Sequence, residues 1–178
     1  MAMSDNNKTT PLLNQQPTEQ LGEVDNPEET RSLGEIGLSQ FTPYLINRIM
    51  GRWSSNLQAP LRDQGLSIVK MRTLAVLSVI SGLTINELSV YTVVEQSTMS
   101  RSLDILEAQA LIRRVASAKD GRVRKIYISD LGREKFEFFW PSMLQEYNQL
   151  FTGISEAEQL SFLKTLHKIL ANTSPKDA

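Results

Sequence analysis

The sequence has no cysteine and only one histidine, His167. Without thiols the chain has no disulfide, no thiolate nucleophile, no zinc-finger ligand set and no thiol-based redox sensor. One histidine excludes a site with several histidine ligands, and His167 has no nucleophile-elbow motif beside it to suggest a hydrolase triad. We therefore expect no enzyme, no metal site and no cofactor.

Long apolar runs are also absent. Even the run at 74–80 is interrupted by Ser78, and a membrane span needs roughly 20 apolar residues. The first 35 residues are polar and acidic, whereas a secretory signal has an apolar stretch there. We expect a soluble, cytoplasmic protein that has no membrane partner.

The net charge of −1 conceals an uneven distribution. Residues 1–39 carry seven acidic and two basic side chains, whereas residues 96–135 carry nine basic and five acidic ones. One basic region in a near-neutral protein suits a binder of phosphates at one place. The alternative is an ordinary solvated surface, which is what most charge runs are.

The chain divides by composition at about residue 40. Residues 1–39 have few apolar side chains and predict a disordered acidic tail, and residues 40–178 predict one domain. In that domain, apolar spacing and capping residues predict helices from Phe41 to about Gly65, from Ser67 to about Ser81, after the capping box Thr84–Glu87, and over roughly Gln96–Ala110.

The period then changes from helical to strand-like. The segments Ile112–Ala116 and Val123–Ile128 are short and rich in β-branched residues, and the loop between them contains Asp120-Gly121. This pattern is typical of a β-hairpin. Two further amphipathic helices are predicted, one after Ser129 and one after Ser155, the first residue of a second capping box.

Three helices closed by a two-stranded hairpin are the parts of a winged helix-turn-helix. The predicted fold class is therefore mainly α with a small β-hairpin wing. A recognition helix needs short polar and basic groups near its start to reach base edges and phosphates. The predicted contacts on that helix are Gln96, Ser97, Thr98, Ser100 and Arg101.

The hairpin supplies three further predicted DNA contacts, namely Arg122, Arg124 and Lys125. Arg122 is expected to enter the minor groove, where the negative potential favours arginine. Asp120 would be repelled by phosphates, so we expect it to orient an arginine of the wing. Each predicted contact on the helix and the hairpin could instead be a solvated surface group. Ser97, Thr98 and Ser100 could also serve as helix caps.

The segment from Asp120 to Gly132 is similar to the wing signature of the MarR family of transcriptional regulators. That signature reads Asp-x-Arg, three residues, Val-x-Leu-Thr, two residues, Gly; here Ile126, Ile128 and Ser129 are mild replacements. The segments Gln96–Arg101 and Leu103–Glu107 resemble the family's recognition helix. Val93 and Glu95 depart from the family pattern in the preceding turn and at the helix cap.

The resemblance implies an obligate homodimer that binds a pseudo-palindromic double-stranded DNA operator. Residues 66–132 would form the winged helix-turn-helix, and 40–65 with 133–172 would form the dimerisation helices. Family members commonly act as repressors that a small aromatic or anionic effector releases from DNA. By analogy, the hypothesis for an effector pocket is Arg48, Arg52 and Trp53.

The residues favour a DNA-binding regulator over two other classes. A protein-interaction module built on a winged-helix scaffold would expose apolar residues on the outer face of the recognition helix, where Ser97, Ser100, Arg101 and Asp104 occur instead. An enzyme would need several convergent titratable groups, and the supply of suitable residues is poor.

Overall fold

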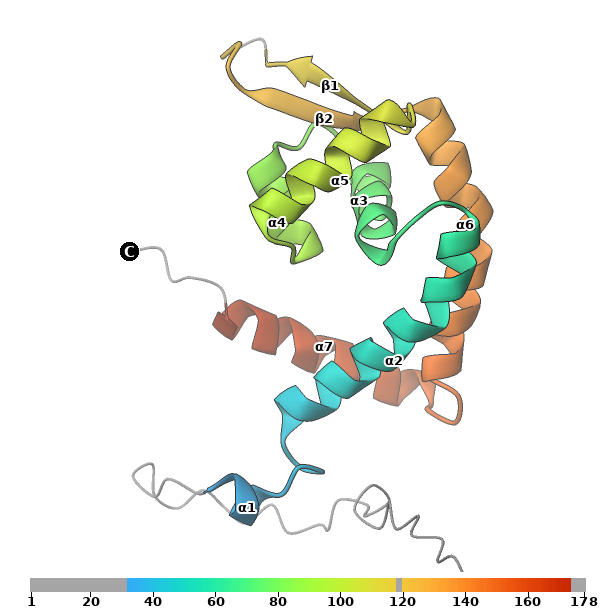
Figure 1. Ribbon diagram of the computed structural model, residues 1–178. Coiled ribbons are helices and arrows are strands. Elements are labelled where there is room, and N and C mark those ends of the chain that lie inside the picture. The colour runs from blue at the N-terminus through green and yellow to red at the C-terminus, as the bar shows by residue number, and fades with distance from the viewer. Residues whose placement is uncertain (1–31, 118–119, 174–178) are drawn as a thin grey trace, which may run out of the picture. The chain divides into compact units, whose positions relative to one another are not determined.

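The computed structural model describes residues 32–117 and 120–173 (Figure 1). The chain forms two compact units that divide between Ser55 and Asn56. In the described part of the chain, no helix is both long and apolar enough to cross a membrane.

The first unit contains α1 (Leu33–Ile36) and the start of α2 (Thr42–Asp63). A capping box begins α1, because the Ser32 hydroxyl accepts a hydrogen bond from the backbone N–H of Glu35 while the Glu35 carboxylate accepts one from the backbone N–H of Ser32. We predicted a disordered tail over residues 1–39, whereas the structure has a helical turn, α1, within the last part of this range. Residues 1–31 lie outside the described residues.

Helix α2 continues into the second unit. It passes through Pro60 and ends at Asp63, close to the predicted end at Gly65. Its last two turns bury Leu57 and Leu61, so the helix has a buried leucine on each side of Pro60 in the sequence.

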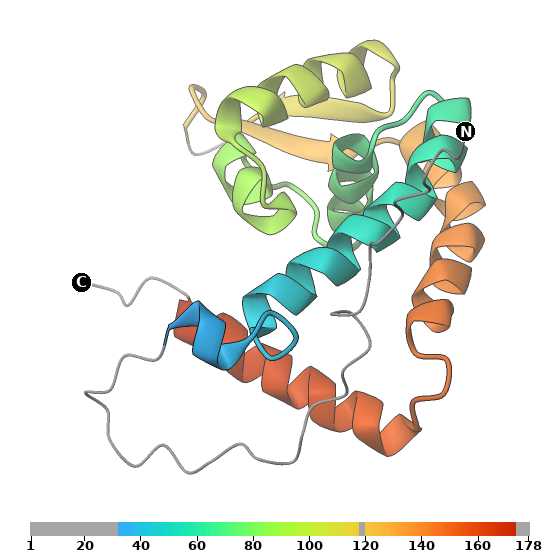
Figure 2. The ribbon, with the colours of Figure 1, turned by 60° about the horizontal axis from the view of Figure 1, so that its bottom comes forward.

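The centre of the second unit is formed by α3 (Ile68–Val79), α4 (Ile85–Thr92), α5 (Gln96–Ala108) and the hairpin of β1 (Ile112–Ala116) and β2 (Arg124–Ile128). Both ribbon views show the hairpin beside α5 (Figures 1 and 2). The predicted caps Ser67 and Thr84 begin α3 and α4, and Thr84 forms its capping box with Glu87. These findings confirm a mainly α fold with a β-hairpin wing.

The hairpin is antiparallel, with Ile112 opposite Ile128 and Arg114 opposite Ile126. Two backbone hydrogen bonds also join Ile126 to the segment before α4, from the N–H of Ile126 to the carbonyl of Leu83 (2.7 Å) and from the N–H of Gly82 to the carbonyl of Ile126 (3.1 Å). The core beneath the hairpin contains the buried side chains Met71, Leu74, Leu77, Leu88, Met99, Leu103, Leu106, Leu111, Ile112 and Ile126. The hairpin is thus fixed to the three helices by both backbone pairing and apolar packing.

Helix α6 (Asp130–Leu150) begins at the predicted cap, Ser129. The Ser129 hydroxyl accepts from the N–H of Gly132 and donates to the carbonyl of Ala110 (2.6 Å), which joins the start of α6 to the start of the hairpin. Helix α7 (Glu156–Thr173) follows, with its capping box at Ser155 and Glu158. None of the side chains of α7 is buried.

Candidate nucleic-acid interface

The first turns of α5 separate polar from apolar side chains. Met99 and Leu103 are fully buried against the core, which turns the opposite face of the helix outward. The structure leaves four of the five predicted contacts exposed and the fifth, Ser100, half-buried; the exposed ones are Gln96 at the first position of the helix and Ser97, Thr98 and Arg101. The helix can therefore present short polar groups and one guanidinium to a ligand.

The turn before α5 has an unusual backbone. Val93, which departs from the family pattern, adopts a left-handed conformation (φ 54°, ψ 53°) that is rare and strained for a β-branched residue. Glu95 stands at the cap position and its side chain makes no capping hydrogen bond. The first amide N–H groups of α5 thus lack a side-chain cap, and such groups favour a negatively charged ligand.

Gln96 is engaged in a contact that the sequence did not indicate. Its amide Nε2 donates to Oδ1 of Asn86 on α4 (2.8 Å). This bond joins the two helices at the exposed end of α5. The bond uses one of the two Nε2 hydrogens, so Oε1 and the other N–H of Gln96 can still contact a base.

The hairpin loop holds Arg122 through the backbone. The carboxylate Oδ1 of Asp120 accepts a hydrogen bond from the backbone N–H of Arg122 (2.9 Å), an Asx-turn geometry over residues 120–122. The side chains of Arg122 and Arg124 are exposed. Asp120 therefore contacts the main chain of the residue that we expected it to orient.

Lys125 is half-buried and lies near α4. Its Nζ is 3.5 Å from Oε2 of Glu87, the capping residue of that helix. Hydrogen bonds from the backbone N–H and the hydroxyl of Thr84 lower the pKa of Glu87, and the positive charge of Lys125 lowers it further. Lys125 thus forms an ion pair with the carboxylate of Glu87.

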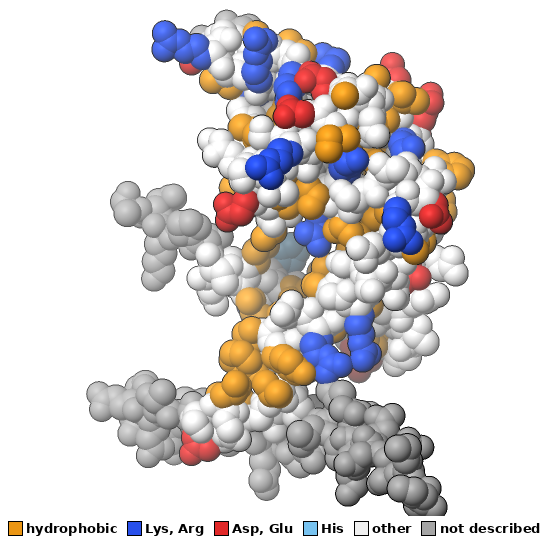
Figure 3. Space-filling view, in the orientation of Figure 1, with side chains coloured by type: hydrophobic (Ala, Val, Ile, Leu, Met, Phe, Trp, Pro, Cys, Tyr) orange, Lys and Arg blue, Asp and Glu red, His pale blue; other side chains and the backbone are white. Residues whose placement is uncertain are grey.

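The cations of this region fall into two groups. Arg113 stacks over the Tyr127 ring (4.5 Å to the centroid), and Arg114 pairs with Asp104 and Glu107 of α5. Arg101, Arg122 and Arg124 form no ion pair with any residue that the structure describes. Figure 3 shows basic side chains gathered over the hairpin, with acidic ones among them.

The sequence indicated the cationic hairpin but not how Arg114 is used. Arg114 counted only as one of nine basic residues, because its partners are close to it only after the hairpin packs on α5. Asp104 and Glu107 are three residues apart on a helix, and that spacing was the available sign of a shared partner.

The hypothetical effector residues lie in the first unit. The guanidinium of Arg48 donates to the hydroxyl of Tyr44 (3.2 Å) and stacks on its ring (5.7 Å to the centroid). Arg52 is exposed, and Trp53 is half-buried with an indole N–H that has no hydrogen-bond partner in the described part of the chain. At about 100° per residue, Arg48 and Arg52 share a face of α2 and Trp53 points about 140° away from Arg48.

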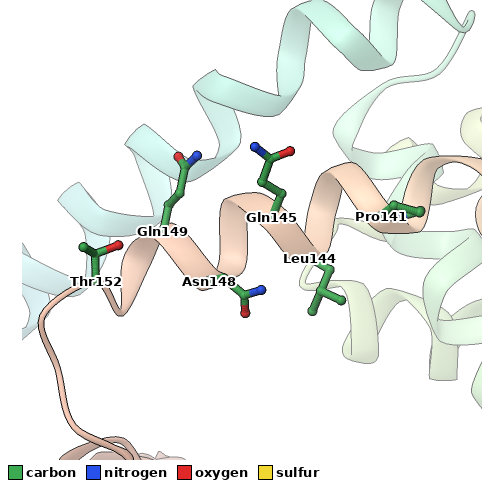
Figure 4. Close-up of a pocket in the computed structure, with 6 residues that line it drawn as sticks. All are labelled: Pro141, Leu144, Gln145, Asn148, Gln149 and Thr152. Carbon is green, nitrogen blue, oxygen red and sulfur yellow. The ribbon is translucent and has the colours of Figure 1, made fainter.

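Two surface hollows lie elsewhere in the second unit. One, of about 500 Å³, is lined by Pro141, Leu144, Gln145, Asn148, Gln149 and Thr152 on α6 and the turn after it (Figure 4). The other, of about 450 Å³, lies beside the start of α5 and is lined by Ser89, Val90, Val93, Val94, Glu95 and Gln96. Neither contains a cationic side chain that would favour an anionic effector.

Known proteins of this architecture share much of the sequence. A structure of a MarR-family transcriptional regulator from Silicibacter pomeroyi is 44% identical and covers 83% of this chain and 100% of its own, with a TM-score of 0.77. The chain belongs to the MarR family. The family profile itself matches residues 64–123, which include the recognition helix and β1 and end just before β2.

Two more distant relatives of this MarR-family chain are informative. The HTH-type transcriptional repressor IacR of Pseudomonas putida is 23% identical over 138 residues, 78% of this chain and 83% of the relative. The structure of S. aureus MepR in complex with DNA is 25% identical and covers 73% of this chain and 96% of its own, with a TM-score of 0.65. The prediction of a MarR-family, DNA-binding transcriptional regulator is confirmed.

Proposed function

We propose that this MarR-family protein is a homodimeric repressor that binds a pseudo-palindromic operator through α5 and the hairpin. The observation that carries the proposal is the exposed polar start of α5 in the same unit as Arg122 and Arg124, two exposed arginines that form no ion pair with a described residue. In this proposal α5 enters the major groove and Arg122 the adjacent minor groove. We place the protein in the cytoplasm and assign it no catalytic role.

The flanking helices support the dimer. A large exposed apolar surface on a soluble protein indicates an interaction site. Such side chains occur on α2 (Leu45, Ile49, Met50), on α6 (Phe138, Trp140, Leu144, Tyr147, Leu150) and on α7 (Leu160, Phe162, Leu163, Ile169, Leu170). A second copy of the chain is the partner that family membership favours for these faces.

The proposal is tested by selection of DNA sequences from a random duplex pool with the purified protein. Enrichment of an inverted repeat, followed by tighter binding to that duplex than to a scrambled one, is the expected result. MepR is known in complex with DNA, and the same mode of recognition is proposed here. Equal affinity for the selected and scrambled duplexes would contradict sequence-specific regulation.

A second candidate function has one observation in its favour. Val90, Tyr91 and Val93 are exposed apolar residues at the end of α4 and in the turn after it, with exposed fractions of 77%, 55% and 85%. A winged domain that docks a protein could use them. Substitution of Val90 by Glu would then abolish partner binding and leave operator affinity unchanged.

We further propose that a small aromatic or anionic molecule releases the repressor from DNA. Arg48 and Arg52, which share one face of α2, are the groups that could bind it. A thermal-shift screen with small aromatic acids tests this, because a ligand that binds only the folded protein raises its melting temperature. A hit should also weaken operator binding, and Arg48→Ala should reduce both effects.

A further inference from the structure

One guanidinium of the hairpin lies between two carboxylates of the recognition helix. Nη2 of Arg114 is 2.7 Å from Oδ1 of Asp104, and Nη1 is 3.0 Å from Oε2 of Glu107. The backbone N–H of Arg114 also donates to the other carboxylate oxygen of Glu107 (3.2 Å). Arg114 therefore forms ion pairs with two acidic groups on α5 at once.

The hairpin register determines this position. Arg114 stands opposite Ile126, and opposed residues of an antiparallel pair project from the same face of the sheet. Ile126 is 1% exposed and packs against the helices, so Arg114 is on the helix-facing side. Its neighbour Arg113 is on the other side, stacked over Tyr127.

The ion pair between Arg114 and Asp104 has a consequence for Arg101. Asp104 follows Arg101 by three residues on α5, and side chains at this spacing are neighbours that can form an ion pair. In the structure Asp104 is bound to Arg114 instead, and Arg101 has no ion-pair partner in the described part of the chain. Without Arg114, Asp104 would be free to attract Arg101.

We propose that Arg114 is a positioning residue for DNA recognition, which binds Asp104 and so leaves the Arg101 guanidinium available to DNA. The inference rests on the proposed function of α5. Arg114 itself contacts no DNA in this proposal, because its charge is already balanced by the two carboxylates.

The first measurement compares Arg114→Gln with the matched control Arg113→Gln. Both variants remove one positive charge from the same strand, so their general effect on attraction to phosphates is alike. On the duplex selected by the wild-type protein, Arg114→Gln should bind about tenfold more weakly than Arg113→Gln, the scale of one lost arginine–DNA contact. Equal affinities of the two variants would overturn the inference.

The second measurement is a double-mutant cycle with Asp104→Asn. In the Arg114→Gln background this change removes the competing carboxylate, and affinity for the selected duplex should rise about fivefold. In the wild-type background Arg114 already occupies Asp104, so the same change should alter affinity less than about twofold. An equal effect of Asp104→Asn in both backgrounds would mean that Asp104 does not compete for Arg101, and would overturn the inference.

The folding of the variants is checked by thermal melting. If Arg114→Gln does not melt cooperatively, the cycle is repeated with Arg114→Lys, which keeps the charge although an ammonium group cannot match the two-carboxylate fork. The same rescue by Asp104→Asn is expected, at smaller amplitude.

A wild-type protein that selects no sequence contradicts the proposed function and this inference together. Successful selection without coupling between Arg114 and Asp104 contradicts the inference alone.

Discussion

At the scale of single residues, the basic side chains of the candidate interface differ in whether a carboxylate already binds them, and their positions in the sequence do not show this difference. Arg114 and Arg122 are both basic residues of the hairpin region, yet Arg114 is paired with two carboxylates. Among the described residues Arg122 has no ion-pair partner, and its backbone N–H donates to Asp120. An unpaired surface arginine can exchange water for phosphate without losing a partner. The two residues should therefore respond differently to substitution.

Arg122→Ala should weaken binding to operator and to scrambled DNA by similar factors. Arginine in a minor groove binds through charge and groove width, which depend only weakly on individual bases. The slope of log affinity against log salt should fall by about one counterion. Titrations of both duplexes at several salt concentrations measure this. Wild-type affinity on both duplexes would show that Arg122 does not contact DNA.

Arg101→Ala should have a more selective effect. If the guanidinium reads a base edge, the loss should be about 1–3 kcal/mol on the operator and much smaller on scrambled DNA. The same titrations provide the comparison. Equal losses on both duplexes would identify Arg101 as a phosphate contact and place sequence specificity elsewhere on α5.

Gly132 is a residue where packing leaves no room for a side chain. A Cβ there would overlap the carbonyl oxygen of Leu111 and lie 2.9 Å from its carbonyl carbon. Gly132→Ala should therefore lower the free energy of unfolding by about 1–3 kcal/mol, as overpacking does elsewhere. Gly51→Ala is the control, since an added Cβ there meets no atom within 4 Å. Equal melting temperatures for the two variants would contradict the steric argument.

At the scale of helices and strands, local signals predicted most of the fold. The capping residues Ser67, Thr84 and Ser129 each begin the helix expected of them, and β1 has the predicted bounds. These signals succeed because a cap or a hairpin loop is determined by residues a few positions apart. Helix α5 ends at Ala108, before the predicted Ala110, because Ala110 adopts a positive φ of 57° as the chain turns into β1.

The missed features depend on contacts between distant segments. Gln96 meets Asn86 and Arg114 meets Asp104 only after the helices and the hairpin have packed. The side-chain types at α5 and the wing were therefore predictable, whereas their partners were not. The helical turn of α1 was missed because four residues are too few to show apolar periodicity.

Helix α7 illustrates how an element can point to its partner. It exposes Phe162 (46%), Leu163 (50%) and Leu170 (65%), and no side chain of the helix is buried. We predict that Leu163→Glu shifts the protein from dimer to monomer, because the dimer interface would have to bury an unpaired charge. Analytical ultracentrifugation measures the shift.

Val79→Glu serves as the control for Leu163→Glu. Val79 ends α3 and is 84% exposed, so the same charge is added to an exposed apolar site outside the proposed dimerisation helices. The Val79 variant should remain dimeric. A dimeric Leu163→Glu variant would exclude this face of α7 from the interface.

At the scale of the whole molecule, a symmetric dimer restricts the spacing of its binding sites. Two recognition helices on one side of the duplex read half-sites about one helical turn, roughly 10 bp, apart. Insertion of about 5 bp between the half-sites rotates one of them to the opposite side of the DNA. Specific binding should then fall to the level of scrambled DNA, because only one α5 can reach its half-site while the other faces backbone.

The control duplex carries base changes in the same central segment without a change in length, and it should keep most of its affinity. Competition binding against the selected operator measures both duplexes, and undiminished affinity after the insertion would rule out a dimer with fixed two-fold geometry.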